Sequence, residues 1–437
     1  MKFGGTSLGD AGSIGRVVGI VRDQLAARPV VVVSAHAGVT DALLAAAQAA
    51  AHGVADVAAI RERHLSLLRE LGLPDSEHTP LLDELRDLVR AIRLVGEASP
   101  KALDAMASFG ERLSARTVAL ALQQAGIEAT AVDAFSAGLR TDSAFGRARP
   151  LPDDGRIARS LAAVRGVPVV TGFVAADEHG EITTLGRNGS DLSAALFASA
   201  LGAEEIQIWK DVDGVRTADP RLVPDALPIR RMSFADVADL ASFGSKVLHP
   251  ASMVPAMQRG IPVRVRNTAE PQQEGTLIAA DVAAGAPAVH AIAHKAQKAL
   301  VTVVSQRLLP QHAFLQRVFG ELDALGCDVG PVTVAEAAVT FAIDELLADA
   351  VQRPLAELGE TRVLRQQAVV GVIGNATSLE NGGIADVLAA VQQAGIPVRC
   401  VGQGARGTTV ALVVDEPRLA DTVRLLHQRF FAAVRGR

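Results

Sequence analysis

The sequence of 437 residues predicts an α/β protein in which a large sheet-and-helix domain is followed by two ferredoxin-like units. Short apolar, β-branched runs alternate with helical stretches over roughly the first 280 residues, which is typical of a largely parallel sheet. Farther along, the pattern changes to short strand–helix–strand units. A stretch rich in Ala, Gly and Pro at 279–288 separates the two patterns, and we expect a domain boundary there.

The first part contains predicted strands at 30–33, 129–132, 167–170, 206–208 and 263–265. The stretch 54–122 is predicted to be mostly helical, because Phe109, Leu113 and Leu120 recur at a spacing that places them on one helix face. We therefore expect a helical subdomain beside the sheet. In the second part, two βαββαβ repeats are predicted from strands at 301–305, 332–343, 369–373, 398–401 and 409–414 and from helices at 313–325 and 383–394.

Composition excludes several classes of protein. The apolar runs are far shorter than the roughly 18 residues that a membrane span needs, and no charged-then-apolar leader opens the chain, so we expect a cytoplasmic protein. A net charge of −5 without a long basic run gives little reason to bind nucleic acid. The only cysteines, Cys327 and Cys400, are too few for a disulfide framework or a thiolate metal site.

The opening Lys-Phe-Gly-Gly-Thr-Ser is the first candidate for chemistry. Gly4 and Gly5 would let the backbone approach a phosphate closely, while Lys2 supplies a cation and the hydroxyls of Thr6 and Ser7 supply donors. A plain strand-to-helix turn is the alternative, and the segment alone does not decide between them. It is not a Walker A loop, because no Gly-Lys pair occurs in the chain.

Two further segments are candidates for ligand binding. The turn at 34–40 comes directly after the strand 30–33, where ligands bind in open α/β sheets. The segment 183–191 precedes a predicted helix, and either Ser190 or Asp191 could simply be its N-cap. Arg187 beside a helix N-terminus would instead form a carboxylate site, because a guanidinium and free N–H groups both favour an anion.

Two later segments complete the set. Three aspartates between 210 and 221 suggest a nucleotide-facing loop, with a solvated surface turn as the alternative. Lys246 lies in a turn of small residues and could reach a phosphate; lysine is rare here, with six against 37 arginines.

The Gly-x-Gly-x-x-Gly at 402–407 is rejected as a dinucleotide motif, because a strand follows it where a helix is required. The histidines show no metal-binding spacing, and no protein-bound metal site is predicted.

These segments, in this order, resemble the aspartokinase branch of the amino-acid kinase family. The matching motifs are Lys-Phe-Gly-Gly-Thr-Ser, Gly-Arg-Asn-Gly-Ser-Asp, Asp-Val-Asp-Gly-Val with Thr-Ala-Asp-Pro-Arg, Ala-Ser-Phe-Gly-Ser-Lys-Val-Leu-His-Pro and Val-Arg-Asn-Thr. The Asn188 form is similar to the kinase half of fusions with homoserine dehydrogenase. The resemblance implies a three-layer αβα kinase domain at 1–280 and tandem ACT domains at 289–437. Of these, 300–365 would form the first ACT unit, and 289–299 with 366–437 the second.

The resemblance also implies a reaction and its ligands. Such an enzyme transfers the γ-phosphoryl group of ATP to the side-chain carboxylate of L-aspartate, the first step toward lysine, threonine and methionine. Mg²⁺ would be bound mainly through the nucleotide. The ACT-like tail implies feedback by an amino-acid effector, lysine or threonine, and a homodimer or higher homo-oligomer.

The site residues implied by the resemblance fall into three groups. The catalytic group is Lys2, Asp191 and Lys246. The aspartate-binding group is Ser34, Thr40, Glu111, Arg187 and Ser190, with Glu111 on the substrate ammonium and Arg187 on a carboxylate. The ATP-binding group is Lys2, Gly4, Gly5, Thr6, Ser7, Lys210, Asp211, Arg216, Arg221, Lys246 and Val247.

The chemistry of the reaction is consistent with these site residues. The attacking carboxylate has an ordinary pKa of about 3.9 and is already ionised at neutral pH, so no general base is required. The obstacle is repulsion between a carboxylate and a polyanionic triphosphate. Catalysis should therefore rest on positioning and on cations, which lysines, an arginine, helix N-termini and Mg²⁺ can supply.

Several positions depart from the family pattern. Only Met1 precedes Lys2, which predicts an incomplete first strand and a loosely anchored lysine. Arg216 replaces a common tyrosine and Lys210 a common threonine. The segment 327–336 lacks the consecutive Thr and Ser of the lysine-sensitive pattern, so the identity of the effector stays open.

The rival functions are a kinase for another acid, such as glutamate or N-acetylglutamate, and a catalytically weak amino-acid sensor.

Overall fold

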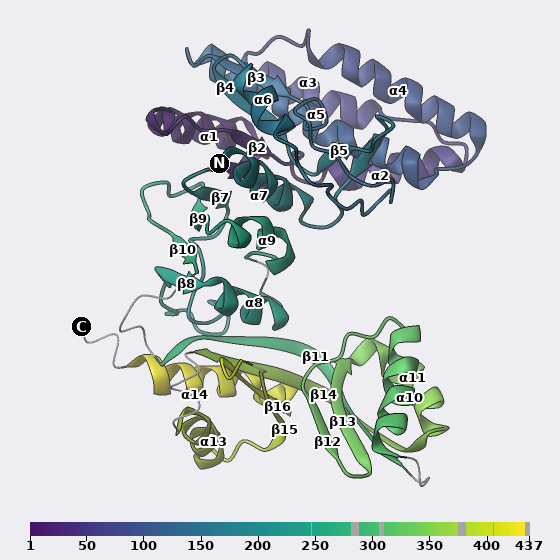
Figure 1. The fold of residues 1–437 in the computed structure, drawn as a ribbon, viewed down its shortest axis with the longest axis vertical. Helices are drawn as coiled ribbons and strands as arrows, with labels where there is room; N and C mark the ends of the chain where they lie inside the picture. Colours follow the sequence, from purple (N-terminus) through teal and green to yellow (C-terminus); the bar gives the residue numbers. More distant parts are fainter. Residues whose placement is uncertain (246, 281–287, 306–309, 375–381, 405, 433–437) are drawn as a thin grey trace. The chain divides into compact units, whose positions relative to one another are not determined.

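The computed structural model describes residues 1–245, 247–280, 288–305, 310–374, 382–404 and 406–432. Contacts divide the chain into two compact units of mixed α/β structure (Figure 1). The first unit comprises Met1–Val215 and His249–Ala280, and the second comprises Arg216–Leu248 and Asp281–Arg437. The segment Arg216–Leu248 therefore belongs by its contacts to the second unit, although it lies inside the first part of the sequence.

The sheet of the first unit runs in the order β3-β4-β2-β1-β7-β9-β10. All neighbouring pairs are parallel except β9 and β10, which are antiparallel. The short first strand thus lies in the middle of the sheet, between β2 and β7. The strands are β1 (Lys2–Phe3), β2 (Val31–Val33), β3 (Ala129–Val132), β4 (Val167–Thr171), β7 (Ile206–Lys210), β9 (Val263–Asn267) and β10 (Thr276–Ala279).

Helices of the first unit build two apolar clusters. One surrounds Phe3, Val33 and Trp209 and lies between the sheet, α1 and α5; the other lies among α2, α4 and α5 around Leu43 and Phe109. The helical subdomain expected at 54–122 is present as α3, α4 and α5. The helices are α1 (Ala11–Asp23), α2 (Val39–Ala51), α3 (Ala58–Leu71), α4 (His78–Val95), α5 (Pro100–Gln124), α6 (Arg156–Ala162), α7 (Gly189–Leu201) and α9 (Pro250–Gln258), with 3-10 turns at Thr6–Leu8 and Leu25–Ala27.

The hairpin of β5 (Val174–Ala176) and β6 (Ile182–Thr184) was not predicted. Each of its strands is only three residues long, which is too short for side-chain alternation to show. Asp104 of α5 holds β6 by accepting hydrogen bonds from the backbone N–H of Thr184 at 3.0 Å and from its hydroxyl at 2.7 Å. The hairpin is therefore fixed to the central helix of the unit.

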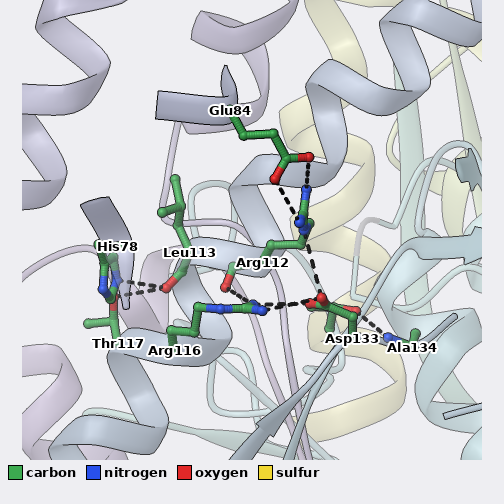
Figure 2. Close-up of polar contacts among 9 residues, drawn as sticks. His78, Glu84, Arg112, Leu113, Arg116, Thr117, Asp133 and Ala134 are labelled. Atoms are coloured by element: carbon green, nitrogen blue, oxygen red, sulfur yellow. Dashed lines mark hydrogen bonds and ion pairs between the residues drawn. The ribbon is translucent and has the colours of Figure 1, made fainter. Parts of the chain in front are cut away.

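Helix α5 is locked in place by ion pairs on two sides (Figure 2). Its N-terminus is defined by Pro100 and by Ser99, whose hydroxyl accepts a hydrogen bond from a first-turn N–H. In its middle, Arg112 donates to both carboxylate oxygens of Glu84 on α4, each at 3.2 Å. One turn later, Arg116 pairs with Asp133, just after β3, at 3.1 and 3.2 Å. The side chains between these anchors consequently have a fixed direction.

The second unit contains an antiparallel sheet in the order β12-β13-β11-β14-β16-β15. Figure 1 shows β11 and β14 running together through the whole unit. Its elements are β8 (Arg231–Ser233), α8 (Phe234–Ser242), β11 (Val289–Ser305), α10 (Gln311–Ala324), β12 (Val332–Ala335), β13 (Ala338–Asp344), α11 (Ala348–Ala356), β14 (Gly359–Gly374), α13 (Ile384–Gln393), β15 (Val398–Gln403), β16 (Thr409–Asp415) and α14 (Leu419–Phe431), with 3-10 turns at Glu345–Leu347 and Glu416–Arg418.

Strands β11 and β14 are each shared between two βαββαβ halves. The end of β11, α10, β12, β13, α11 and the start of β14 form one half; the end of β14, α13, β15, β16 and α14 form the other. The start of β11 completes this second half, because Val289 pairs with Gly374 and Ala293 with Gly371. The sequence indicated only the apolar ends of the two long strands, since polar residues such as Lys295 and Gln366 interrupt the apolar pattern in between.

A β-bulge marks the middle of each long strand. Gln297 and Gln366 both adopt φ of 55°, and the register shifts next to them, with Lys295 opposite Val369 but Lys298 opposite Gln367. An extra residue in one strand moves the side-chain alternation by one position. Both halves can therefore bury their helix-facing side chains on the same face of one continuous sheet.

The segment Arg216–Leu248 is built into this second unit by its own side chains. Ala218 and Val223 lie in the apolar cluster formed with α13 and α14. Thr217 accepts a hydrogen bond from the Ile292 backbone N–H at 2.7 Å and contacts the buried His427 at 2.9 Å.

No helix in the described part of the chain is long and apolar enough to cross a membrane.

The apolar core of the first βαββαβ half offers a test of the fold. Phe341 is fully buried among the strands and α10 and α11, whereas Leu346 is 95% exposed. We expect Phe341→Ala to lower the free energy of unfolding by about 3–5 kcal/mol, because it leaves a cavity in the core. Leu346→Ala, the control, should change it by less than about 0.5 kcal/mol. Urea unfolding of both variants measures this, and equal effects would contradict the described packing.

Candidate active site

A cavity of about 540 Å³ opens at the carboxyl ends of the central strands of the first unit. This is the edge at which parallel α/β sheets bind ligands. The lining comes from the turns after β1 and β2, from α5, from the start of α7 and from the end of β7. The polar and aromatic lining residues are Lys2, Ser34, His36, Thr40, Asp41, Glu111, Phe173, Arg187, Asn188, Ser190, Asp191 and Lys210.

Two lysines and one aspartate form the charged centre of this cavity. The ammonium group of Lys2 lies 2.6 Å from one carboxylate oxygen of Asp191, and that of Lys210 lies 3.3 Å from the other. Burial opposes ionisation of Asp191, but the two ammonium groups hold its pKa below the ordinary value. The cluster therefore carries one net positive charge in a buried position, which favours a polyanionic ligand.

The prediction that Lys2 is loosely anchored is wrong. Lys2 is only 5% exposed, and β1 pairs with β2 on one side and β7 on the other. Two residues suffice for this strand because Phe3 is fully buried and stacks on Trp209 of β7. The lysine next to it is then directed at Asp191.

The N-terminus of α7 faces the same cavity. Asn188 is the N-cap, with φ of 59° in the left-handed region, and it makes no side-chain cap hydrogen bond. Neither Ser190 nor Asp191 is thus the N-cap; both lie in the first turn. With Arg187 directly before it, the helix presents free N–H groups and a guanidinium to an anion. Asn and Gly tolerate a left-handed backbone better than most residues, which explains why Asn is suitable at position 188.

Glu111 is a buried acid in the wall of the cavity. It projects from the middle of α5, is 3% exposed, and its Oε2 has no hydrogen-bond partner among the described residues. Burial raises its pKa to about 8, against the opposing effects of the Ala35 backbone and the charge of Lys2. The approach of α5 requires Gly110, because a Cβ there would lie 2.7 Å from that of Ala35. A cation entering the cavity would find in Glu111 an uncompensated carboxyl group.

The turn after β2 lines the cavity through Ser34 and Thr40. Its backbone is held by Ser114 of α5, whose hydroxyl donates to the Ser34 carbonyl at 2.7 Å, and by the buried His36, whose Nδ1 contacts the Leu8 carbonyl at 2.6 Å. Burial lowers the pKa of His36 to about 4, so the imidazole is neutral and acts as a structural group.

Phe173 is a lining residue that sequence reasoning missed. It adopts φ of 62° without being glycine, and its ring packs where a Cβ on Gly189 would meet it at 2.7 Å. A strained backbone at a binding cavity indicates that the surrounding structure imposes the conformation. Nothing in the local sequence, a single Phe between Gly and Val, signals this role.

Among the described residues, several that were predicted to bind ATP do not line the cavity. Four of them belong to the first unit: Gly4, Thr6, Ser7 and Asp211. Ser7 instead forms a hydrogen bond with Thr268 at 2.7 Å. Three others belong to the second unit, where Arg221 pairs with Asp219 at 2.7 Å. These three are Arg216, Arg221 and Val247. Lys246 lies outside the described residues.

Comparison with known proteins gives consistent matches. Residues 1–267 match the family model described as the amino acid kinase family. Aspartokinase 3 of the Arabidopsis thaliana chloroplast is 33% identical over 458 residues, which cover 99% of this chain and 81% of that protein.

Two solved structures of Escherichia coli aspartokinase III are also similar. The complex with aspartate and ADP has a TM-score of 0.79 at 32% identity and covers 98% of this chain and 99% of that one. The complex with lysine and aspartate has a TM-score of 0.84 at 31% identity, with 98% of both chains covered. The likeness thus extends over both units of the chain.

The raised pKa of Glu111 predicts a pH-dependent stability. Because the folded protein keeps a proton on Glu111 up to about pH 8, whereas the unfolded chain loses it near 4.5, the unfolded state binds fewer protons between these values. The contribution of Glu111 to stability therefore falls as the pH rises. Relative to Glu111→Gln, which stays neutral, the wild type should lose on the order of 3 kcal/mol between about pH 5 and 8. Urea unfolding at both pH values tests this; a constant difference between the proteins would contradict it.

Proposed function

The chain belongs to the aspartokinase branch of the amino acid kinase family, and we propose that its first unit transfers the γ-phosphoryl group of ATP to the side-chain carboxylate of L-aspartate. The products are ADP and 4-phospho-L-aspartate. The observation that carries the proposal is the joint presence, in one cavity, of a buried lysine pair on Asp191 and of the opposed groups Glu111 and Arg187.

Charge complementarity supports the binding of aspartate. The substrate carries one ammonium and two carboxylates, and the cavity offers Glu111 for the former and Arg187 with the N-terminus of α7 for the latter. An ammonium beside Glu111 would favour its ionised form and remove the cost of the buried, unpartnered oxygen. Hydroxyl groups of Ser34, Thr40 and Ser190 are available to the remaining oxygens. An acylated amine, as in N-acetylglutamate, would leave Glu111 without a charge to pair with.

Phosphoryl transfer needs cations more than it needs a base. The β-carboxylate of aspartate is an ionised nucleophile at neutral pH, so the protein must offset its repulsion from the triphosphate. Lys2 and Lys210 are held for this by Asp191, which fixes their ammonium groups without fully neutralising them. By resemblance, Gly4 and Gly5 would approach the phosphates and Lys246 would add a further charge.

The nucleotide is ATP, and its Mg²⁺ would be held mainly by phosphate oxygens. Among the described residues no group of three or more metal-ligating side chains is assembled, and Asp191 is engaged by two lysines, so a nucleotide-borne ion suits the cavity. When bound, Mg²⁺ neutralises charge on the transferring phosphate. Thr6, Ser7, Asp211, Arg216, Arg221 and Val247 stay assigned to ATP by resemblance only.

The second unit is proposed to have a regulatory role in a homodimer or larger homo-oligomer in the cytoplasm. Its two βαββαβ halves have the element order of paired ACT domains. The similar E. coli enzyme has been solved with lysine bound, which supports lysine, with threonine as the alternative, as the effector. Calorimetric titration with each amino acid tests this, and no heat with either would refute it.

Acyl-phosphate trapping tests the reaction directly. With ATP, Mg²⁺, L-aspartate and hydroxylamine, the wild type should form aspartyl hydroxamate. Lys2→Met should reduce turnover by about 10²-fold or more, because it removes a cation next to the transferring group. Lys101→Met replaces a half-exposed lysine outside the cavity and should leave turnover unchanged. Absence of hydroxamate with the wild type would favour an amino-acid sensor.

Arg187→Ala should chiefly raise the KM for aspartate, because the guanidinium would contact the substrate both before and during the reaction. An increase of about tenfold or more is expected, with a smaller change in kcat. Arg93→Ala, at an exposed position near the end of α4, is the matched control. Steady-state kinetics with aspartate as the varied substrate gives both constants. A wild-type KM in Arg187→Ala would remove this residue from the site.

A further inference from the structure

A short turn in the wall of the first-unit cavity carries its guanidinium group. Gly186–Asp191 lines the cavity without interruption, and Arg187 is exposed within it. The backbone N–H of Gly189 donates to the carbonyl of Gly186 at 3.0 Å, which closes a turn with Arg187 in its second position. Gly186 and Asn188, on either side of Arg187, have left-handed backbones with φ of 70° and 59°. The direction of Arg187 therefore depends on how the two ends of this turn are held.

The end of the turn continues into α7, and its start follows β6. Thr184 is the last residue of β6 and lies two positions before Gly186. The hydroxyl of Thr184 donates to one carboxylate oxygen of Asp104 at 2.7 Å, and its backbone N–H donates to the other at 3.0 Å. The chain that leads into the turn is therefore attached to α5 through the side chain of Asp104.

The same carboxylate also holds a second piece of backbone, the loop 142–149. The N–H of Gly146 donates to Asp104 at 2.9 Å, and the N–H of Ala148 donates to the carbonyl of Thr184 at 2.8 Å. This loop packs against the start of the turn, because a Cβ on Gly186 would lie 3.4 Å from the carbonyl oxygen of Gly146. Asp104 thus fixes two neighbouring segments, and both of them contact the residues directly before Arg187.

Asp104 is a buried acid without a cationic partner among the described residues. Burial raises its pKa, against the opposing effects of the hydrogen bonds from Gly146 and Thr184. An ionised carboxylate accepts hydrogen bonds and donates none, so each polar group around it must donate. A shift of Thr184 or Gly146 would leave a buried charge with fewer partners, which is unfavourable. The carboxylate and its donors consequently hold one another in place.

Asp104 shares α5 with the acid that lines the cavity. Asp104 and Glu111 are seven positions apart, which is about two turns, so they lie on one face of the helix about 10 Å apart along its axis. Glu111 lines the cavity, whereas Asp104 does not. The helix itself is anchored by the ion pairs of Arg112 and Arg116. One fixed helix therefore carries Glu111 and also holds the segment that leads to Arg187.

We propose that Asp104 is a positioning residue for Arg187: it sets the place of the guanidinium relative to Glu111, so that a carboxylate and the ammonium of one aspartate molecule are bound together. The inference deepens the proposed function and rests on it, because both take L-aspartate as the ligand of this cavity. Without Asp104 the start of the turn loses its attachment to α5. A displacement of about 1 Å in a binding group can reduce a rate by about 10²-fold.

Calorimetric titration of the full chain with L-aspartate tests the proposal. Asp104→Ala should raise the Kd about tenfold, while the KM for ATP stays within about twofold, because only the aspartate contacts are displaced. Asp104→Asn should bind nearly as well as the wild type, since its amide oxygen can accept both N–H groups and its amide nitrogen can donate to the Thr184 hydroxyl. Wild-type affinity in Asp104→Ala, or equal losses in the two variants, would overturn the proposal.

Thr117→Val is the matched control. Thr117 is a buried polar residue of the same helix and its hydroxyl contacts His78 at 2.9 Å, so the variant also removes a contact between two elements. It leaves the segment before Arg187 unchanged and should bind aspartate like the wild type. A loss equal to that of Asp104→Ala would show that any defect in α5 weakens binding, and the specific role of Asp104 would be refuted.

A double-mutant cycle separates positioning of Arg187 from a general fold defect. If Asp104 acts through Arg187, adding Asp104→Ala to Arg187→Ala should weaken aspartate binding by no more than about twofold beyond Arg187→Ala alone. Independent effects would multiply to about 10²-fold and would overturn the proposal. Circular dichroism reports the folding of each variant. If Asp104→Ala does not fold, Thr184→Val replaces it in the cycle, with an expected loss of about threefold that must likewise vanish beside Arg187→Ala.

Failure of the positioning role and failure of the proposed function give different results. Hydroxamate from the wild type, together with an unchanged Kd and turnover in Asp104→Ala, would refute the positioning role alone. A wild type that forms no hydroxamate, but binds aspartate and loses affinity in Asp104→Ala, would refute phosphoryl transfer and support the positioning role. A wild type that binds no L-aspartate would refute both.

Discussion

Two ammonium groups converge on one buried carboxylate in the first unit, and the arrangement around them follows from keeping that cluster in place. Lys2 opens β1 and Lys210 ends β7, the adjacent parallel strand, and both side chains reach the same carboxylate. Asp191 comes from the first turn of α7, where the helix dipole also favours a negative group. Two cations this close would repel each other in a buried position without the aspartate, and the aspartate would be costly to bury without them. The result is a fixed, positively charged site that requires no further reorganisation when a polyanion binds.

A second constraint acts on α5, which carries Glu111 at the opposite wall. The ion pairs of Arg112 and Arg116 hold the helix from both sides, directly after Glu111, so this part of α5 has little freedom (Figure 2). Glu111 is thereby kept in a place where it has no partner of its own. The protein thus combines one cluster of paired charges with one unpaired acid in a single cavity, and it is the unpaired acid that distinguishes a ligand with an ammonium from one without.

Much of the fold could be predicted from periodicity, because the strands of the first unit are short apolar runs and the helices of 54–122 have regular apolar faces. The polar middles of β11 and β14 could not, since bulges and charged residues such as Lys298 remove the alternation. For the site, glycine turns and rare lysines indicated Lys2 and the segment at Arg187. Glu111 needed the family resemblance, because one glutamate in a helix carries no local signal. Phe173 was missed for a related reason: its strained backbone is imposed by tertiary packing.

The sharing of β11 and β14 between two halves affects how the second unit folds. Neither half contains four strands of its own, because each borrows from a strand that begins or ends in the other. Removing either half would expose the edge of a long strand, a template for pairing with other chains. The two halves should therefore form and lose structure as one cooperative body, with a contact order raised by the pairing of Val289 with Gly374 at the end of β14. During synthesis the start of β11 must then wait until the end of β14 has been made, and its unpaired edge is exposed to misassembly in the meantime.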